Sequence, residues 1–401
     1  MTAPVLAVFL DGLGYDGLAD MPFLAGQSTV RRIRTELGYS ITCHASMYTG
    51  LRPDRHGLWF VWQRDAGRSP FRWLRPFRWL DPVDNLPMRL AATKITRRFV
   101  RTTSWFGIPY VVNFPWRDMP QLDVSERRLW PEPHYLATAP TIFDRMRAAG
   151  LEFEIVGMER RGPRGLAAFE EAPTEATAAG AGVGGNPPAL RYLFAGDIDH
   201  VSHAHRRHSD EARDVRRRID AAIERQFAAA RRRDPSTELV VWSDHGHHDV
   251  ERVDPFETFA AHGVDLRRQL TVVDTNFVRM WIPDERRRRE VAARLDAVGI
   301  GRVMDEPALA GYRCAMPDDR YGNLIFYLDR PRAFSRTIWG FARGLVSAHG
   351  YLPDYPESDG VFISTRGVED RQLQLADVAP SLAGLLGLSM PAGLDGAAAW
   401  D

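Results

Sequence analysis

The chain has 401 residues, of which 44% are apolar and 26% are charged, an ordinary composition for a globular enzyme with a large core. Its 52 basic and 52 acidic side chains cancel, which excludes a global charge that would attract polymeric nucleic acid or an anionic membrane. Any anionic ligand must therefore be bound by a local site.

The cysteine usage and the start of the chain indicate the cellular compartment. Cys43 and Cys314 are too few for a disulfide framework, and Met1 leads into a strand-like run without a basic leader region. No apolar run approaches the roughly 20 residues needed to span a bilayer. We therefore expect a cytoplasmic protein without a transmembrane anchor, while the sequence leaves its oligomeric state open.

Short β-branched apolar runs alternate with helical patterns along the chain. The predicted strands are Pro4–Leu10, Leu151–Val156, Arg191–Phe194, Glu238–Trp242 and Gly360–Ile363, and the clearest helices are Thr141–Ala149, Asp210–Arg231 and Arg286–Val298. Continuous apolar strands between helices indicate a mostly parallel sheet covered on both faces, an α/β sandwich. Functional residues of such sheets follow the carboxyl ends of the strands.

Three stretches interrupt this alternation within what we interpret as one catalytic domain, residues 1–401. Residues 58–133 are rich in Trp, Phe, Arg and Pro, and form either a lid or substrate wall or a structural excursion with its aromatic side chains packed inward. Residues 250–348 suggest a small cap. The Ala/Gly/Pro-rich stretch Ala172–Pro188 is typical of a surface loop.

The first strand ends at Asp11, and the glycines after it match a dinucleotide-binding pattern. Gly12, Gly14 and Gly17 form G-x-G-x-x-G, but that fingerprint requires a second strand ending in an acid about 20 residues on. The stretch Ser28–Glu36 is polar, and we predict no strand there. We therefore favour Asp11 as a metal ligand and the glycines as turn formers. A Rossmann-type oxidoreductase is the alternative from another class.

Ser40 precedes a short helical segment that ends in Thr49-Gly50. A side chain at a helix N-terminus lies near N–H groups that stabilise anions. Most serines in such positions only cap the helix. This segment alone therefore does not assign catalysis.

Aspartate and histidine recur together after later strands. Asp199 and His203 are four residues apart and can face the same ion from one helical turn, Asp244 and His245 are adjacent, and His349 precedes a glycine. A single histidine is more often a buried side chain with its hydrogen bonds satisfied. Their recurrence at strand ends favours a metal centre over a metal-free binding protein.

Further histidines lie close to these motifs in the sequence. We predict that most of them are solvated surface residues or partners that orient the ligands: His200, His205, His208, His247 and His248.

Taken in order, these segments resemble the alkaline-phosphatase superfamily, and within it the type I phosphodiesterase/nucleotide pyrophosphatase proteins. The resemblance extends from Asp11 to a closing helix at residues 377–387, and implies an alkaline-phosphatase-like α/β/α sandwich with a mostly parallel central sheet and inserted cap or lid segments. It also implies two metal sites, one held by Asp11, Asp244 and His245, and the other by Asp199, His203 and His349.

The same resemblance implies a nucleophile that also binds the first ion. In this family it lies nine residues before the threonine of the T-G pair, which is Ser40 here, with Thr42 as the fallback. His203 follows Ser202 where the family usually has glycine. The sulfatase pattern C-x-P-x-R fails in the segment that begins at Cys43, so a sulfatase is not expected.

The sequence therefore predicts a phosphodiesterase or nucleotide pyrophosphatase that forms a phosphoserine-type intermediate between two divalent ions. Mixed imidazole and carboxylate ligation favours zinc, with manganese or iron as alternatives. The expected substrate is a small-molecule phosphate ester or diester. A phosphomonoesterase is the alternative within the superfamily, because the insertion offers phosphate-binding arginines as well as aromatic side chains: Arg68, Arg72, Arg75, Arg78, Arg97 and Arg98.

Overall fold

The computed structural model describes residues 3–103, 108, 114–159, 163–172, 188–338, 340–341 and 345–400. These form two compact units. The sheet unit comprises Met1–His56, Trp130–Asp249 and Val346–Asp401, and the second unit comprises Gly57–Leu129 and Val250–Leu345. Residues 173–187 of the predicted surface loop lie outside the described residues.

The sheet unit is built on seven strands in the order β19-β2-β18-β7-β1-β6-β5. Strand β18 runs antiparallel to both of its neighbours, and the other pairs in the sheet are parallel. The strands are β1 (Val5–Leu10), β2 (Thr29–Arg34), β5 (Phe153–Val156), β6 (Leu190–Ala195), β7 (Glu238–Trp242), β18 (Gly360–Ser364) and β19 (Leu373–Gln374). The predicted mostly parallel sheet is confirmed.

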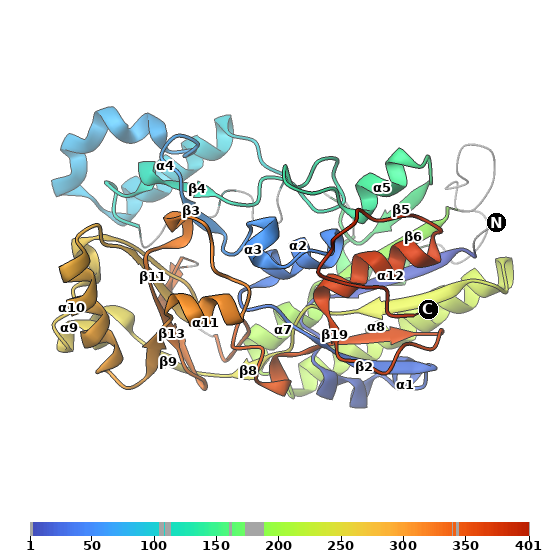
Figure 1. The fold of residues 1–401 in the computed structure, drawn as a ribbon. Helices are drawn as coiled ribbons and strands as arrows, with labels where there is room; N and C mark the ends of the chain where they lie inside the picture. The colour runs from blue at the N-terminus through green and yellow to red at the C-terminus, as the bar shows by residue number, and fades with distance from the viewer. Residues whose placement is uncertain are drawn as a thin grey trace. The chain divides into compact units, whose positions relative to one another are not determined.

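Helices cover both faces of this sheet (Figure 1). Successive side chains of β1 point to opposite faces. Val8 packs in an apolar cluster with Ile219 and Ile223 of α8, whereas the Phe9 ring lies 6.5 Å from that of Tyr48 in α2. The helices are α1 (Pro22–Ala25), α2 (Ser40–Thr49), α3 (Pro53–His56), α5 (Ile142–Ala148), α6 (Gly165–Glu171), α7 (Asp197–His205), α8 (Asp210–Arg233) and α12 (Val378–Leu385). The fold is the predicted α/β/α sandwich.

Local sequence signals explain the helix boundaries. Thr141 caps α5 through a reciprocal pair of hydrogen bonds with Asp144, and Ser209 accepts a hydrogen bond from the Ala212 amide at the start of α8. Both helices lie within two residues of their predicted bounds. Helix α12 matches the predicted closing helix.

The prediction of no strand within Ser28–Glu36 is wrong, because β2 occupies Thr29–Arg34. Arg31 and Arg32 are exposed, and only Thr29 and Ile33 are buried, so the apolar signal is weak. Main-chain pairing with β18 and β19 holds the strand instead. Strand β2 does not pair with β1, so the arrangement still differs from the dinucleotide-binding one, in which these two strands are neighbours.

The second unit contains a four-stranded antiparallel sheet in the order β10-β11-β13-β12, with α10 packed on it. Helix α10 covers most of the predicted helix Arg286–Val298. The strands are β3 (Trp62–Arg64), β4 (Leu122–Val124), β9 (Glu251–Val253), β10 (Leu270–Val273), β11 (Phe277–Trp281), β12 (Gly301–Val303), β13 (Leu324–Leu328), β14 (Arg332–Phe334), β15 (Arg336–Thr337) and β16 (Gly340–Phe341). The helices are α4 (Leu86–Phe99), α9 (Pro255–Ala261), α10 (Glu285–Asp296) and α11 (Glu306–Gly311).

The Trp-rich insertion contains both buried and exposed aromatic side chains. Trp59, Trp62 and Trp116 are buried within the second unit, whereas Trp73 and Trp79 are exposed. Helix α4, within the same stretch, was not predicted. The roles of residues 58–133 as a lid and of residues 250–348 as a cap stay predictions.

Among the described residues, no helix combines the length and the apolar character required to cross a membrane.

Candidate metal centre

Three predicted ligands meet because two neighbouring strands end at the same edge of the sheet. Asp11 directly follows β1, and Asp244 and His245 follow its parallel neighbour β7. The chain turns at Gly12 with φ +77°, where a Cβ atom would lie 2.9 Å from the Cα of Asp199. This confirms the turn-forming role of Gly12.

The first cluster consists of Asp11, Asp244, His245 and Ser40, all with little solvent exposure. Nε2 of His245 lies 3.4 Å from Oδ1 of Asp11, 3.3 Å from Oδ2 of Asp244 and 3.1 Å from Oγ of Ser40. The other oxygen of Asp244 accepts hydrogen bonds from the amides of Gly12 and His245. The Asp244 carboxylate is thereby fixed with one oxygen directed into the cluster.

Ser40 is the first residue of α2, after Tyr39 in an extended conformation. The amides of Thr42 and Cys43 donate to the Tyr39 carbonyl oxygen, so the earlier amides of Ser40 and Ile41 are those that could face an anion. The hydroxyl that could attack such an anion therefore lies at the start of α2 and beside His245.

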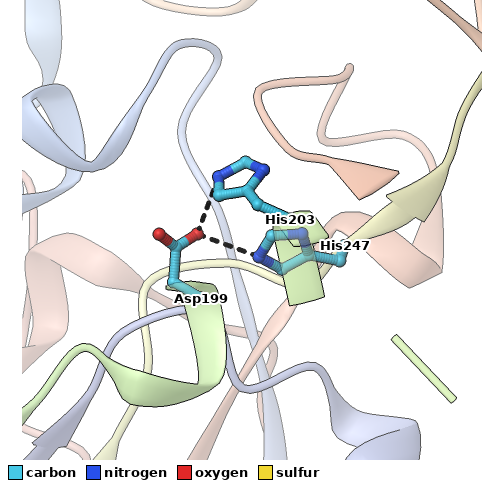
Figure 2. A group of neighbouring side chains, drawn as sticks. All are labelled: Asp199, His203 and His247. Atoms are coloured by element: carbon cyan, nitrogen blue, oxygen red, sulfur yellow. Dashed lines mark hydrogen bonds and ion pairs between the residues drawn. The ribbon is translucent and has the colours of Figure 1, made fainter. Parts of the chain in front are cut away.

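The second cluster is centred on one oxygen of Asp199, in the first turn of α7. Oδ1 of Asp199 lies 3.2 Å from Nε2 of His203, 2.9 Å from Nε2 of His247 and 3.6 Å from Nε2 of His349 (Figure 2 shows the first two). His203 follows Asp199 by one helical turn, as its spacing predicted.

The two clusters adjoin each other. One ligand atom from each of Asp199, His245 and His349 fits within a mutual distance of 4.8 Å, as do those of Asp11, Asp244 and His245. His245 therefore belongs to the first cluster while its side chain borders the second.

Buried charge shifts the ionisation of both clusters. Burial, together with repulsion from Asp199, raises the pKa of Asp11 well above its usual range, and burial and Asp11 raise the pKa of Asp244 to about 8. Burial also opposes the charged form of Asp199, but the charge and hydrogen bond of His203, with the hydrogen bond of His247 and the charge of His349, hold the pKa of Asp199 well below its usual range. Ionising several buried carboxylates together is unfavourable without a cation.

The chemistry of the donor atoms fits metal ions. Within the described residues, the buried atoms Oδ1 of Asp11 and Oδ2 of Asp244 have no hydrogen-bond partner. Carboxylate and imidazole groups are the usual protein ligands of zinc and other transition metals. Each predicted ligand lies in one of the two clusters.

The other histidines near these motifs differ in their solvent exposure. His200, His205 and His208 are exposed, as expected, but His247 and His248 are buried. His247 was not among the predicted ligands, and its adjacency to the Asp244-His245 pair was the only sequence signal for it. Other residues near the motifs have structural contacts: Asp197 accepts a hydrogen bond from the Leu166 amide, and Cys43 is a buried free thiol.

This sheet, with carboxylates and imidazoles at the strand ends, has an alkaline-phosphatase-type fold. The chain belongs to the type I phosphodiesterase / nucleotide pyrophosphatase family of phosphoric ester hydrolases, whose model matches residues 5–352. No curated protein matches the chain in sequence.

Solved structures share the fold at low sequence identity. Murine ectonucleotide pyrophosphatase / phosphodiesterase 5 is 15% identical with a TM-score of 0.65, over 97% of this chain and 96% of that one. An inactive variant of that murine protein, in complex with AMP, is 16% identical with a TM-score of 0.64, over the same shares. The human protein is 15% identical with a TM-score of 0.62, again over 97% and 96%.

Proposed function

We propose that this protein is a two-metal phosphodiesterase or nucleotide pyrophosphatase in which Ser40 is the nucleophile. The observation that carries the proposal is the approach of Ser40 Oγ to within 3.1 Å of Nε2 of His245, inside the cluster that Asp11 and Asp244 complete. The contact with His245 is made by Ser40, which supports Ser40 over the fallback Thr42.

Asp11, Asp244, His245 and Ser40 would hold one divalent ion, and the cluster around Asp199 would hold the other. When bound, two such ions would supply positive charge to the phosphoryl group and would lower the pKa of the attacking hydroxyl. The donor set favours zinc over magnesium or calcium, with manganese or iron as alternatives.

The chain itself supplies the nucleophile and its orientation. Ionised Ser40 attacks phosphorus, the bond to the leaving oxygen breaks, and a phosphoserine-type intermediate forms. Amides in the first turn of α2 stabilise the non-bridging oxygens. Water then attacks the phosphorus, releases the phosphate product and regenerates Ser40.

The substrate is a small-molecule phosphodiester or pyrophosphate. Family membership supports this class, and a structural neighbour was solved in complex with AMP. A phosphomonoesterase is the alternative. Comparing turnover of a nitrophenyl phosphate with that of the corresponding diester distinguishes them, and a strong preference for the monoester would contradict the diesterase.

Metal content tests the whole proposal. The purified protein should contain close to two equivalents of transition metal by elemental analysis, and a chelator should abolish turnover until metal is returned. A fully active protein without metal would contradict the proposal.

Cytoplasmic localisation is a separate proposal, which rests on the cysteine usage and is tested by cell fractionation.

A further inference from the structure

His247 is a buried imidazole that the site predicted from the sequence does not use. It lies in the segment between β7 and the two-residue strand β8 (His248–Asp249), and its side chain is 1% exposed. Its Nε2 lies 2.9 Å from Oδ1 of Asp199, closer than either His203 or His349 (Figure 2). Three imidazoles therefore approach one carboxylate oxygen.

The other nitrogen of His247 is held by Ser347, from the facing two-residue strand β17 (Ser347–Ala348). Oγ of Ser347 lies 3.0 Å from the carbonyl oxygen of His248 and 3.3 Å from Nδ1 of His247. A hydroxyl has one proton, and the shorter contact assigns it to the carbonyl. When Nε2 binds an ion, the ring keeps its proton on Nδ1, and Oγ of Ser347 is placed to accept it.

Ser347 also holds His203, through its main chain. The carbonyl oxygen of Ser347 lies 2.8 Å from Nδ1 of His203, and because a carbonyl only accepts, this nitrogen carries a proton. Nε2 of His203 is thus the nitrogen left for a metal. A metal-bound histidine commonly donates its other N–H to an oxygen in this way.

We propose that His247 is a fourth protein ligand of the ion at Asp199, and that Ser347 is the positioning residue that presents both His203 and His247. This inference rests on the proposed function, because it concerns the second metal site. A carboxylate only accepts, so Nε2–H of His247 donates to Oδ1 of Asp199 at 2.9 Å, and a cation between these two atoms would replace that proton. One ligand atom from each of Asp199, His203 and His247 lies within 4.8 Å of the others. Three imidazoles with one carboxylate also select transition metals over magnesium and calcium.

The backbone at Gly12 leaves space beside Nε2 of His247. A Cβ atom at Gly12 would lie 3.0 Å from Nε2 of His247, so a larger residue would crowd the same nitrogen. The nitrogen that faces Asp199 is thus bordered by a position without a side chain.

The test is metal binding by the full chain after chelator treatment, measured by competition with a chromophoric chelator for zinc and cobalt. His247→Ala should weaken one of the two sites by at least about a hundredfold and alter the visible absorption of bound cobalt. Ser347→Ala should weaken the same site by about ten- to a hundredfold. If the His247→Ala variant does not fold, His247→Gln takes its place in the test, because glutamine keeps much of the volume of the side chain.

His248→Ala is the matched control. His248 is adjacent and also buried, but its Nε2 lies 2.9 Å from Oγ of Ser358. This variant should keep both affinities. A nitrogen NMR spectrum of the zinc-loaded protein should show His247 protonated at Nδ1 and bound to metal at Nε2.

Three results would overturn the inference: wild-type affinities in the His247 variants, a weakened site with an unchanged cobalt spectrum, or Nε2 of His247 still protonated in the zinc-loaded protein. The second result would mean that His247 only orients Asp199. Each leaves the proposed function intact if the wild-type protein binds two ions. A wild-type protein that binds no ion would instead reject the proposed function.

Discussion

The imidazole rings of His245 and His349 stack face to face, with centroids 3.7 Å apart and planes 4° from parallel. The two residues come from different segments of the sheet unit, one after β7 and the other after β17. Because each is a proposed ligand in a different cluster, the stack fixes the two metal sites relative to each other.

Loss of His349 should therefore weaken one ion's site more than the other's. His349→Ala deletes a ligand near Asp199 and the ring stacked on His245, but it leaves Asp199, His203 and His247 in place and does not touch Ser40, Asp11 or Asp244. We expect about one equivalent of metal after dialysis against a chelator under which the wild-type protein keeps two, measured by elemental analysis. His262→Ala is the control, since His262 is exposed and its Nδ1 lies 3.0 Å from the Thr258 carbonyl oxygen. Two retained equivalents in the His349 variant would contradict its role.

Removal of the nucleophile should separate catalysis from metal binding. Ser40→Ala should lower kcat by at least about a thousandfold, because the covalent step is lost, while the three remaining ligands of its cluster keep metal in place. Thr42→Ala is the paired variant and should keep substantial turnover. Steady-state kinetics on a nitrophenyl diester and metal analysis measure both effects. Full activity of Ser40→Ala would reject the assignment.

Asp244→Asn should stabilise the metal-free protein at high pH. Burial and Asp11 raise the pKa of Asp244 from 3.8 to about 8, so the folded state holds this proton more tightly than the unfolded state. The contribution of Asp244 to stability is therefore lost as pH rises from about 4 through about 8. Asparagine cannot ionise, and its oxygen can accept the same two amide hydrogen bonds.

Thermal unfolding in the presence of chelator checks the direction of this change of stability with pH. The variant should unfold at a higher temperature than the wild type at pH 9 and close to it at pH 5. With metal present the order should reverse at pH 9, because the variant has lost a charged ligand. An equal change at both pH values without metal would show that Asp244 is not a buried ionising group.

Gly12→Ala should destabilise the fold by about 2 kcal/mol or more, because alanine is strained at φ +77° and its Cβ would meet the main chain of Asp199. Gly150→Ala is a matched control, since Gly150 has φ +68° with no atom within 4 Å of the added Cβ. Urea unfolding should show the smaller loss for Gly150→Ala, about 1 kcal/mol. Equal losses would mean that the turn at Gly12 adapts.

Bound metal should stabilise the folded protein. A ligand that binds only the folded state at a hundred times its Kd contributes about 2.7 kcal/mol per site. Chelation should therefore lower the unfolding temperature, and zinc should restore it. An unfolding temperature that does not respond to chelator would contradict metal binding in the folded state.

The parts of the fold that the sequence predicted are those with a strong local signal. Strand β1 is a continuous apolar run ending in Asp11, and α5 starts at a Thr141–Asp144 capping pair. Strand β2 was missed because its exposed arginines hide a strand that is held by pairing with β18, far away in sequence. Helix α4 was missed because its buried positions are few: Ala92, Thr93 and Thr96.

The residues of the candidate site likewise differ in whether the sequence could predict them. Asp11, Asp244 and His245 could be found because each lies within three residues of the end of an apolar strand. His247 could not be distinguished from His248 by sequence, since both follow the same motif and both are buried. The structure distinguishes them, because Nε2 of His247 lies 2.9 Å from Oδ1 of Asp199, whereas Nε2 of His248 lies 2.9 Å from Oγ of Ser358.

The centre draws its ligands from the first strand of the chain and from residues beyond β17, with the whole second unit encoded between them. Contacts of such large sequence separation form late and slow the search for the native topology. During synthesis, Asp11 and Asp244 emerge from the ribosome well before His349 exists. A chain that ends before Ser347 lacks His349 but holds every ligand of the first cluster, so it should accumulate with the second site incomplete and without a full complement of metal.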